Sequence, residues 1–332
     1  MREGKHMRLI ENLRNHRGLW LLAIGISGFL SLATCTSRLH AQAGWEGETG
    51  VFVTPLAYTS NVEGEKVHPS VAYHYFHAGP IIGDFHEIST EIGFNKRFEV
   101  GYMHEFHELG DSGGLITPTG TDNLNYLWQN GFEVFNGKAN IIPENFHKNI
   151  YIPAVSVGFI ARTDVRNVGD YLTWNDTKNG GMHNEDVYLV ASKTVTQFSK
   201  KVPIVLNAGV RGTNAELWGM GGNAPDWQAK AFGAVAFAFT GPKRSSIVLG
   251  SEASMQPHHP YGYTSFSDKG GLPLNIPTTL TYCTRIVPVP KYHVNVDFGV
   301  AQVAGRIFNN GHGEVVDLNA RHSYGTQITW AF

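Results

Sequence analysis

Apolar and polar side chains alternate along much of the chain, most regularly after residue 85. Between His86 and Phe94 the even positions include two isoleucines and a phenylalanine, while the odd positions carry Glu, Ser and Gly. Successive side chains of a β-strand point to opposite faces, so a repeat of two predicts a strand with one apolar and one polar face. Asn95 and Lys96 provide a tight turn into the next alternating segment, which predicts a β-hairpin.

The same alternation recurs in other segments, and no helical period of usable length appears after residue 44. The pattern predicts an all-β protein. The expected strands cover residues 50–58, 70–78, 85–94, 97–106, 131–142, 150–162, 186–196, 203–211, 229–239, 245–256, 278–286, 292–303 and 323–332.

The connections between these strands differ in length along the chain. Short turns near residues 95, 200, 242 and 288 alternate with long loops near residues 118, 174, 220, 266 and 312. A transmembrane antiparallel up-and-down β-barrel, with short periplasmic turns and long external loops, predicts this asymmetry. A soluble exported β-sandwich is the alternative, because its strands alternate as well. Aromatic residues near strand ends favour the barrel, since such residues gather at membrane interfaces: Tyr58, Tyr102, Tyr151, Tyr292 and Trp330.

The last ten residues, 323–332, form an uncharged strand with one aromatic face. Tyr324, Ile328, Trp330 and Phe332 share that face, and the chain ends on the phenylalanine. This ending resembles the closing strand of Gram-negative outer-membrane β-barrel proteins, in which the terminal Phe is the assembly signal. The resemblance implies an outer-membrane location, a surrounding lipid bilayer and recognition by the barrel-assembly machinery. We expect this strand to close the barrel against the first strand.

Residues 1–43 have the features of a signal peptide. Five basic residues lie within the first 17, an apolar run spans residues 19–34, and Ala41-Gln42-Ala43 is an A-x-A cleavage site. The run is short for a membrane span of about 20 residues. Residues 32–35 also resemble a lipoprotein box that would lipidate Cys35, although Thr34 is unfavourable there. We therefore expect a signal peptide at 1–43 and one barrel domain at 44–332.

The composition of the chain excludes some kinds of binding partner and some classes of protein. The leader carries six basic and two acidic residues, which leaves 20 basic and 26 acidic residues in the mature chain. This acidic balance argues against nucleic acid. Cys283 is the single cysteine left after cleavage, so no internal disulfide is expected. No second apolar run approaches 18 residues, which excludes a helical membrane protein.

The strand count is odd at about 13, whereas single-chain bacterial barrels contain an even number. The doubtful region is 50–84. Either the candidate at 70–78 is not a spanning strand, which gives 12, or one strand is missed, which gives 14. We favour 12. Residues 79–102 and 212–227 also resemble parts of exported barrel proteins without an assigned activity, so no catalytic or ligand residue follows from the resemblance.

In a barrel the polar faces point into the lumen, where buried charges must be paired or hydrated. One interpretation is a passive channel that selects small hydrophilic solutes by charge and width. The other is a closed lumen braced by ion pairs and blocked by loops. A barrel of 12 strands lies between small packed barrels and open porins, so both remain. The predicted lumen residues are Glu87, Glu91, Arg97, Glu99, Glu105, Arg162, Arg211, Glu252, Arg285, His293 and Asp297.

Other chemistries find less support in the sequence. His pairs at a spacing of three, such as His74 with His77, point to opposite faces of a strand, so no metal or other cofactor is expected. A barrel hydrolase would need a Ser–His pair, and no sequence signature indicates one. Aromatic residues in the long loops suit stacking on a glycan or docking of a partner. A structural barrel in envelope or exopolysaccharide secretion is therefore the alternative to a channel. These loop residues are Trp128, Trp174, Trp218, Trp227, Tyr261, Tyr263 and Phe266.

Overall fold

A computed structural model describes eleven parts of the chain. They are residues 42–60, 67–110, 115–117, 120–122, 131–165, 183–199, 202–215, 227–257, 277–288, 293–309 and 315–332. The predicted leader up to Ala41, with Cys35, lies outside them. So do most of the predicted aromatic loop residues, of which Trp227 alone is described.

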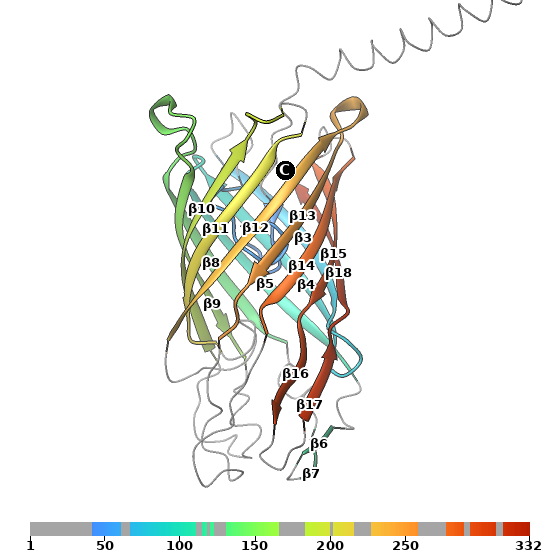
Figure 1. The fold of residues 1–332 in the computed structure, drawn as a ribbon. Coiled ribbons are helices and arrows are strands. Elements are labelled where there is room, and N and C mark those ends of the chain that lie inside the picture. The colour runs from blue at the N-terminus through green and yellow to red at the C-terminus, as the bar shows by residue number, and fades with distance from the viewer. Residues whose placement is uncertain are drawn as a thin grey trace, which may run out of the picture.

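Twelve antiparallel strands form one closed barrel in the described residues (Figure 1). Each strand pairs with its neighbour in the chain, and the last pairs with the first, as in an up-and-down barrel. The strands are β3 (Val67–His77), β4 (Gly83–Phe94), β5 (Phe98–Leu109), β8 (Glu133–Ile142), β9 (Ala154–Thr163), β10 (His183–Val195), β11 (Ile204–Thr213), β12 (Gln228–Thr240), β13 (Ser246–Ser254), β14 (Thr279–Val287), β15 (Val294–Gln302) and β18 (Ser323–Ala331).

Smaller elements lie at the two ends of the barrel and inside it. The strand pairs β6 (Leu115–Thr117) with β7 (Gly120–Asp122), and β16 (Ala304–Asn309) with β17 (Val315–Ala320), extend from the end opposite the C-terminus (Figure 1). A third pair joins β1 (Gln42–Ala43) to β2 (Thr49–Gly50). The 3-10 helices η4 (Phe146–Lys148) and η5 (Pro242–Arg244) lie in turns. No helix in the described ranges is long and apolar enough to cross a membrane.

The all-β prediction and the count of 12 are confirmed, but the strand that we left out is the wrong one. The candidate at 70–78 is the first barrel strand, β3, whereas the candidate at 50–58 does not join the barrel sheet. Pro55 supplies the physical reason. It lacks the N–H that a central strand donates to its neighbour, and proline is therefore confined to edges, bulges and strand starts.

The two faces of the barrel wall differ as the alternation predicts. Outward side chains such as Ile88, Val100 and Phe298 are about half exposed and apolar, while the side chains between them are polar and buried. An apolar band around a closed sheet suits hydrocarbon, because none of the twelve described barrel strands has an edge without a neighbour. The predicted turn is also present, since Asn95 and Lys96 have φ values of 52° and 58°, as a tight hairpin turn requires.

The closing seam joins β18 to β3. Tyr324 lies opposite His77, and the pairing continues to Ala331 opposite Ser70. The terminal Phe332 donates its N–H to the carbonyl oxygen of Pro69 at 3.0 Å, so the last residue of the chain bonds to the first barrel strand. The predicted closure is confirmed, with β3 as the partner.

Replacement of Phe332 by alanine tests whether the terminal side chain serves in assembly. We expect Phe332→Ala to lower the amount of heat-modifiable barrel in the outer membrane several-fold, because the variant loses the aromatic end of the seam. Phe298→Ala is the matched control, since Phe298 is 51% exposed and Phe332 is 52% exposed on the outward side. Equal membrane levels of the two variants, measured on unheated gels, would remove the special role of the C-terminus.

Candidate functional site

Residues 43–60, here called the plug segment, lie inside the barrel. Figure 1 shows this N-terminal segment in blue within the cylinder of strands. Trp45 and Phe52 are buried, and Glu48, Thr49 and Ala57 have no exposed surface. Barrel strands pass on all sides of the segment, yet it contributes no strand to the barrel sheet. The interior of the barrel is therefore filled by the chain's own N-terminal region.

The plug segment is folded on itself by backbone hydrogen bonds. The N–H of Trp45 donates to the carbonyl oxygen of Phe52 at 2.7 Å, and the N–H of Leu56 donates to that of Thr49 at 3.0 Å. The N–H of Val51 donates to the carbonyl oxygen of Thr54 at 2.9 Å. Buried backbone groups require such partners. The segment is thus a compact loop with a defined shape.

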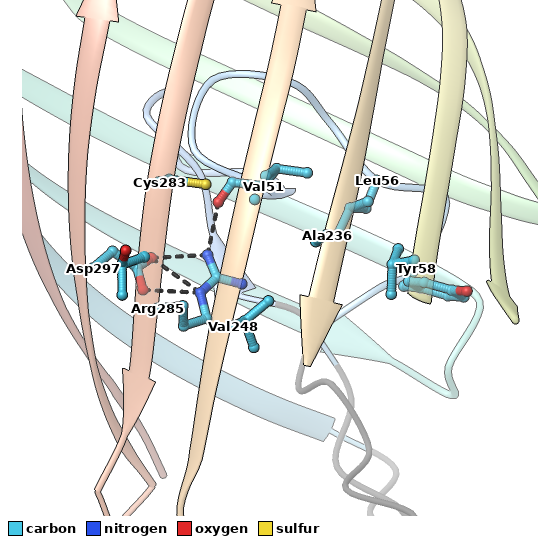
Figure 2. Close-up of a pocket in the computed structure, with 11 residues that line it drawn as sticks. Val51, Leu56, Tyr58, Ala236, Val248, Cys283, Arg285 and Asp297 are labelled. Carbon is cyan, nitrogen blue, oxygen red and sulfur yellow. Dashed lines mark hydrogen bonds and ion pairs between the residues drawn. The ribbon is translucent and has the colours of Figure 1, made fainter. Parts of the chain in front are cut away.

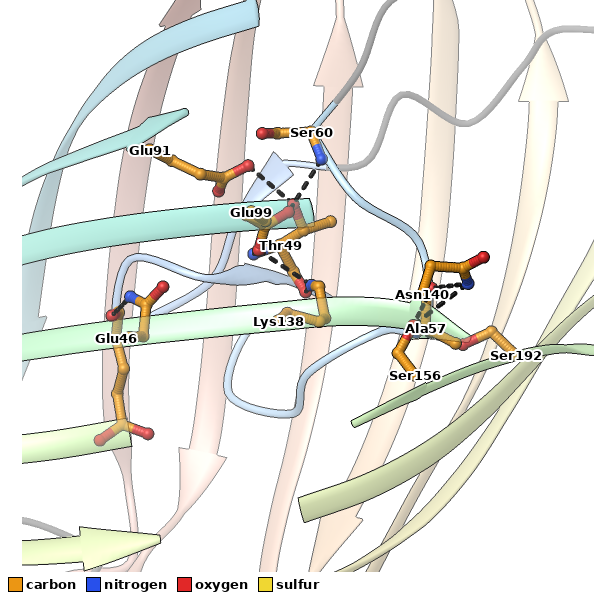
Figure 3. Close-up of polar contacts among 11 residues, drawn as sticks. Glu46, Thr49, Ala57, Ser60, Glu91, Glu99, Lys138, Asn140, Ser156 and Ser192 are labelled. Carbon is orange, nitrogen blue, oxygen red and sulfur yellow. Dashed lines mark hydrogen bonds and ion pairs between the residues drawn. The ribbon is translucent and has the colours of Figure 1, made fainter. Parts of the chain in front are cut away.

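Thr49 attaches the plug segment to the β4–β5 hairpin and to β8 (Figure 3). Its N–H donates to Glu99 at 2.8 Å, and its hydroxyl lies 2.7 Å from a carboxylate oxygen of Glu91. Lys138 bonds to the Thr49 carbonyl oxygen at 2.9 Å and forms an ion pair with Glu99 at 3.0 Å. The N–H of Ser60 donates to Glu99 at 2.8 Å. One lysine and two carboxylates therefore hold this side of the plug segment.

Glu252 on β13 holds the opposite side. Its carboxylate accepts hydrogen bonds from the N–H of Val53 at 2.7 Å, from the N–H of Thr54 at 2.9 Å and from the hydroxyl of Thr54 at 2.7 Å. Hydrogen bonds to a charged acceptor are stronger than neutral ones. No cation pairs with Glu252 in the described residues, so the plug segment itself satisfies this carboxylate.

Arg285 on β14 contacts both the wall and the plug segment (Figure 2). Its guanidinium donates to both carboxylate oxygens of Asp297 on β15, at 2.8 to 3.1 Å, and to the Val51 carbonyl oxygen at 2.8 Å. A cavity of about 40 Å³ lies here, bordered by Val51, Cys283 and Arg285. It has room for only a few water molecules.

The Arg162 side chain connects Glu46 of the plug segment to the wall. It donates to Glu46 and, at 2.8 Å, to Asp186 on β10. Arg211 on β11 lies 3.3 Å from the same Asp186 oxygen. Arg162 is fully buried, and a buried charge is tolerated only when it is paired and hydrogen-bonded. The plug segment thus completes a network that the wall begins.

Neutral polar groups of the wall bind the backbone of the plug segment in the same way. The Ala57 carbonyl oxygen accepts from Asn140 at 2.9 Å and from Ser156 at 2.6 Å, and its N–H donates to Ser192 at 2.8 Å (Figure 3). Asn207 donates to the Pro55 carbonyl oxygen at 3.0 Å. These contacts come from β8, β9, β10 and β11. Most of the barrel strands therefore bind the plug segment.

Glycines in the wall make room for the aromatic side chains of the plug segment. A Cβ atom at Gly299 would lie 2.8 Å from the Phe52 ring, and one at Gly325 would lie 3.1 Å from it. A glycine within a strand commonly marks such a close approach. Trp45 packs edge to face on Phe76, with ring centroids 4.8 Å apart. Apolar contact thus supplements the polar bonds.

The predicted lumen residues fall into two groups. Nine are buried and point inward, namely Glu87, Glu91, Glu99, Glu105, Arg162, Arg211, Glu252, Arg285 and Asp297. The other two lie in turns. Arg97 donates to the Asn140 carbonyl oxygen at 3.0 Å from the β4–β5 turn. His293 precedes β15 with a φ of 53°. For these two the expected place on a strand was wrong, because the turns begin and end one or two residues away from the positions we inferred.

Three buried carboxylates have no hydrogen-bond partner in the described residues. They are Glu48 in the plug segment, Glu87 on β4 and Glu105 on β5, with both oxygens of each unpaired. Such groups cost free energy unless a water, a proton or a cation compensates them. No group of three or more His, Cys, Asp or Glu side chains in the described ranges has the arrangement of a metal site.

Sequence reasoning missed one Ser–His pair. His74 on β3 and Ser89 on β4 lie 2.9 Å apart, from Nε2 to Oγ, and each is 1% exposed. The pair is a neighbouring-strand contact, which no spacing within one strand reveals. In the described residues no carboxylate hydrogen-bonds to His74, and the Trp45 ring lies 6.4 Å from the imidazole. The pair is enclosed by the plug segment.

Sequence reasoning also missed the plug segment itself. The available signals were Pro55 in the middle of an expected strand and the glycines at positions 44, 47 and 50. Proline and glycine both disfavour a regular barrel strand. Gly47 uses this freedom, since its φ is 79°. These features predict an irregular segment, although they do not say where it lies.

Similar folds occur among solved barrels, at low sequence identity. The KdgM porin is 10% identical with a TM-score of 0.41, and it covers 79% of this chain and 99% of its own. The NanC porin is 6% identical with a TM-score of 0.42, covering 80% and 98%. An outer-membrane channel from Pseudomonas putida F1 is 9% identical with a TM-score of 0.42, covering 87% and 98%. At these scores the fold assignment rests on the closed sheet of the chain itself.

The sequence comparisons identify the family but no activity. A search of curated proteins gives no significant match. A family model described as "Protein of unknown function (DUF3034)" matches residues 42–265, which include the plug segment and the strands from β3 to β13. This match spans more than half of the chain. The chain therefore belongs to the DUF3034 family.

Proposed function

We propose that this protein is an outer-membrane channel for small polar solutes whose lumen is closed by the plug segment and opens when that segment leaves its place. The observation that carries the proposal is the independence of wall and plug. The twelve strands close without any residue of 43–60. Release of the plug segment would therefore leave a complete barrel.

The contacts between the wall and the plug segment are of a kind that water can replace, which supports the proposal that the segment can leave. The wall binds the segment mainly through side chains that also hydrate well, among them Glu252, Asn140, Ser156 and Ser192. When the segment leaves, water can replace each of these hydrogen bonds, so the net cost per bond is about 1 kcal/mol. A polar interior is typical of barrels that conduct water and solutes.

The same features support our proposal for the location of the protein. We place the barrel in the outer membrane of a Gram-negative bacterium, with the C-terminus and the turn at 95–97 on the periplasmic side. We further propose that the leader is cleaved after Ala43, so that the plug segment of the mature chain consists of residues 44–60. The mature N-terminus at Gly44 then lies inside the lumen, because Gly44 N–H donates to the Glu48 carbonyl oxygen. Barrel-assembly machinery would insert the chain through its terminal strand.

A permanently closed barrel that serves as a structural or secretion component is the second candidate. The observation in its favour is the number of bonds that hold the plug segment. The two candidates differ in one measurable property, because only a channel conducts ions when the plug segment is released. A hydrolase is less well supported, since the His74–Ser89 pair is enclosed and lacks a carboxylate partner.

A cross-link between plug and wall tests the gate. Val51 and Cys283 line the same small cavity (Figure 2). A Cβ atom at Gly250 would lie 2.9 Å from the Cys283 sulfur and 3.6 Å from Val51 Cγ1, so both side chains flank one glycine. We expect Val51→Cys, joined to Cys283 by oxidation or by a short bis-thiol reagent, to be silent in planar bilayers. Reduction or omission of the reagent should restore channel openings.

The control for this experiment removes the second thiol. Val51→Cys combined with Cys283→Ser carries the same change in the plug segment but cannot be joined to the wall. Its conductance should not respond to oxidant or reagent. Openings of the cross-linked protein equal to those of the control would show that the current does not pass through the lumen occupied by residues 43–60.

Weakening the attachment of the plug segment should have the opposite effect. Glu252→Gln keeps the shape of the side chain but loses the charge that four donors share. A loss of about 1.5 kcal/mol of attachment raises the open fraction about tenfold. Glu108→Gln is the control, because the Glu108 side chain is 73% exposed and does not contact the plug segment. An unchanged open fraction in Glu252→Gln would argue for the permanently closed barrel.

A further inference from the structure

The charges of the lumen are unevenly distributed, which bears on the solutes that can pass. The barrel strands bury seven carboxylates but only four lysine and arginine side chains. Arg285 pairs with Asp297 on the wall, whereas Arg162 and Arg211 share the single carboxylate of Asp186. Lys138 is matched by Glu99. With the plug segment gone, seven wall carboxylates face four wall cations, so the lumen keeps an excess of three carboxylates.

The unmatched carboxylates gather on the β4–β5 hairpin. Glu87 lies directly opposite Glu105 in the register of the two strands. Both are fully buried, and all four carboxylate oxygens are without a hydrogen-bond partner. Like charges directly opposite each other on neighbouring strands destabilise a sheet. The pair therefore costs free energy, and no hydrogen bond from the two strands offsets it.

The plug segment adds further carboxyl groups at the same place. Glu46 and Glu48 are electrostatic neighbours of Glu87. Glu46 is bound by Arg162, whereas Glu48 has no exposed surface and both of its oxygens are unpaired. Three unpartnered carboxylates from two separate parts of the chain thus meet in one region. Cations are the solutes that such a region attracts.

We propose that the open lumen selects cations, and that the Glu87–Glu105 pair is its main specificity-determining element. The inference rests on the proposed function, because selection requires a conducting lumen. A tight metal site is not implied, since the described residues contain no group with that geometry. Conduction instead requires attraction that is weak enough for the ion to leave. Two carboxylates on a wall that water can reach meet that requirement.

The reversal potential in a salt gradient measures this selectivity directly. Glu252→Gln in the full chain is the background, because its plug segment is weakened. Across a roughly tenfold KCl gradient we expect a reversal potential with the sign of K⁺ preference. Adding Glu87→Gln and Glu105→Gln should lower the permeability ratio of K⁺ to Cl⁻ about threefold, with a larger effect at low salt, where screening is weaker.

Two further variants serve as a control and as a milder substitution. Glu108→Gln on the same background changes an exposed carboxylate of the same hairpin and should leave the ratio unchanged. The single Glu87→Gln variant removes the repulsion with the smallest change. Replacing a buried unpaired charge by an amide should not impair folding, and migration on unheated gels checks that each barrel is folded.

The possible outcomes separate the two proposals. Conductance with Cl⁻ preference, or a ratio that the double substitution leaves unchanged, would overturn the inference about cations and leave the channel intact. Absence of conductance in folded Glu252→Gln, at every voltage and in every variant, would overturn the channel itself. K⁺ preference that depends on Glu87 and Glu105 would support both.

Discussion

In hydrocarbon a backbone N–H or carbonyl group finds no water, so each must be paired within the protein. The β18–β3 seam meets this requirement here, because it gives the last free strand edge a partner. The rest of the architecture follows from that closure. Once the sheet is closed, each strand has an apolar outward face and an inward face toward an enclosed space. The inward face carries many charged and polar side chains beside apolar ones, and the plug segment fills the space that they enclose.

The plug segment solves a second problem that closure creates. Carboxylates, arginines and a lysine face an enclosed lumen, and a dry lumen would leave many of them without partners. Residues 43–60 supply backbone N–H and carbonyl groups to Glu99, Glu252, Lys138 and Arg285. Water in an open lumen could supply the same bonds. The interior is therefore compatible with both a closed and an open state, which is the physical basis for the gate that we propose.

Much of the wall could be predicted from the sequence, because its determinants are local. A period of two identifies a strand and its two faces, and a pair such as Asn95-Lys96 identifies a tight turn. Nine of the eleven expected lumen residues are buried for this reason. The errors at Arg97 and His293 are errors of strand boundary, which alternation defines only to within a residue or two.

The contents of the lumen could not be predicted in this way, since they depend on contacts between distant residues. Glu252 meets Thr54 across 198 positions of the sequence, and Arg285 meets Val51 across 234. The His74–Ser89 pair and the Glu87–Glu105 pair depend on the register between strands. Residues 50–58 resemble a strand in composition, and only Pro55 and the nearby glycines argued against that interpretation. The local pattern therefore predicts the barrel wall, whereas strand register and long-range contacts determine which residues meet inside the lumen.

The central claim is that the barrel is complete without the plug segment and is closed by it. Deletion of residues 44–60, followed by bilayer recording of the inserted protein, tests this claim most directly. The account predicts a folded, heat-modifiable barrel that conducts steadily, in contrast to a full-length chain that is mostly silent. A deletion variant that cannot fold, or one that folds and remains as silent as the full-length chain, would contradict it.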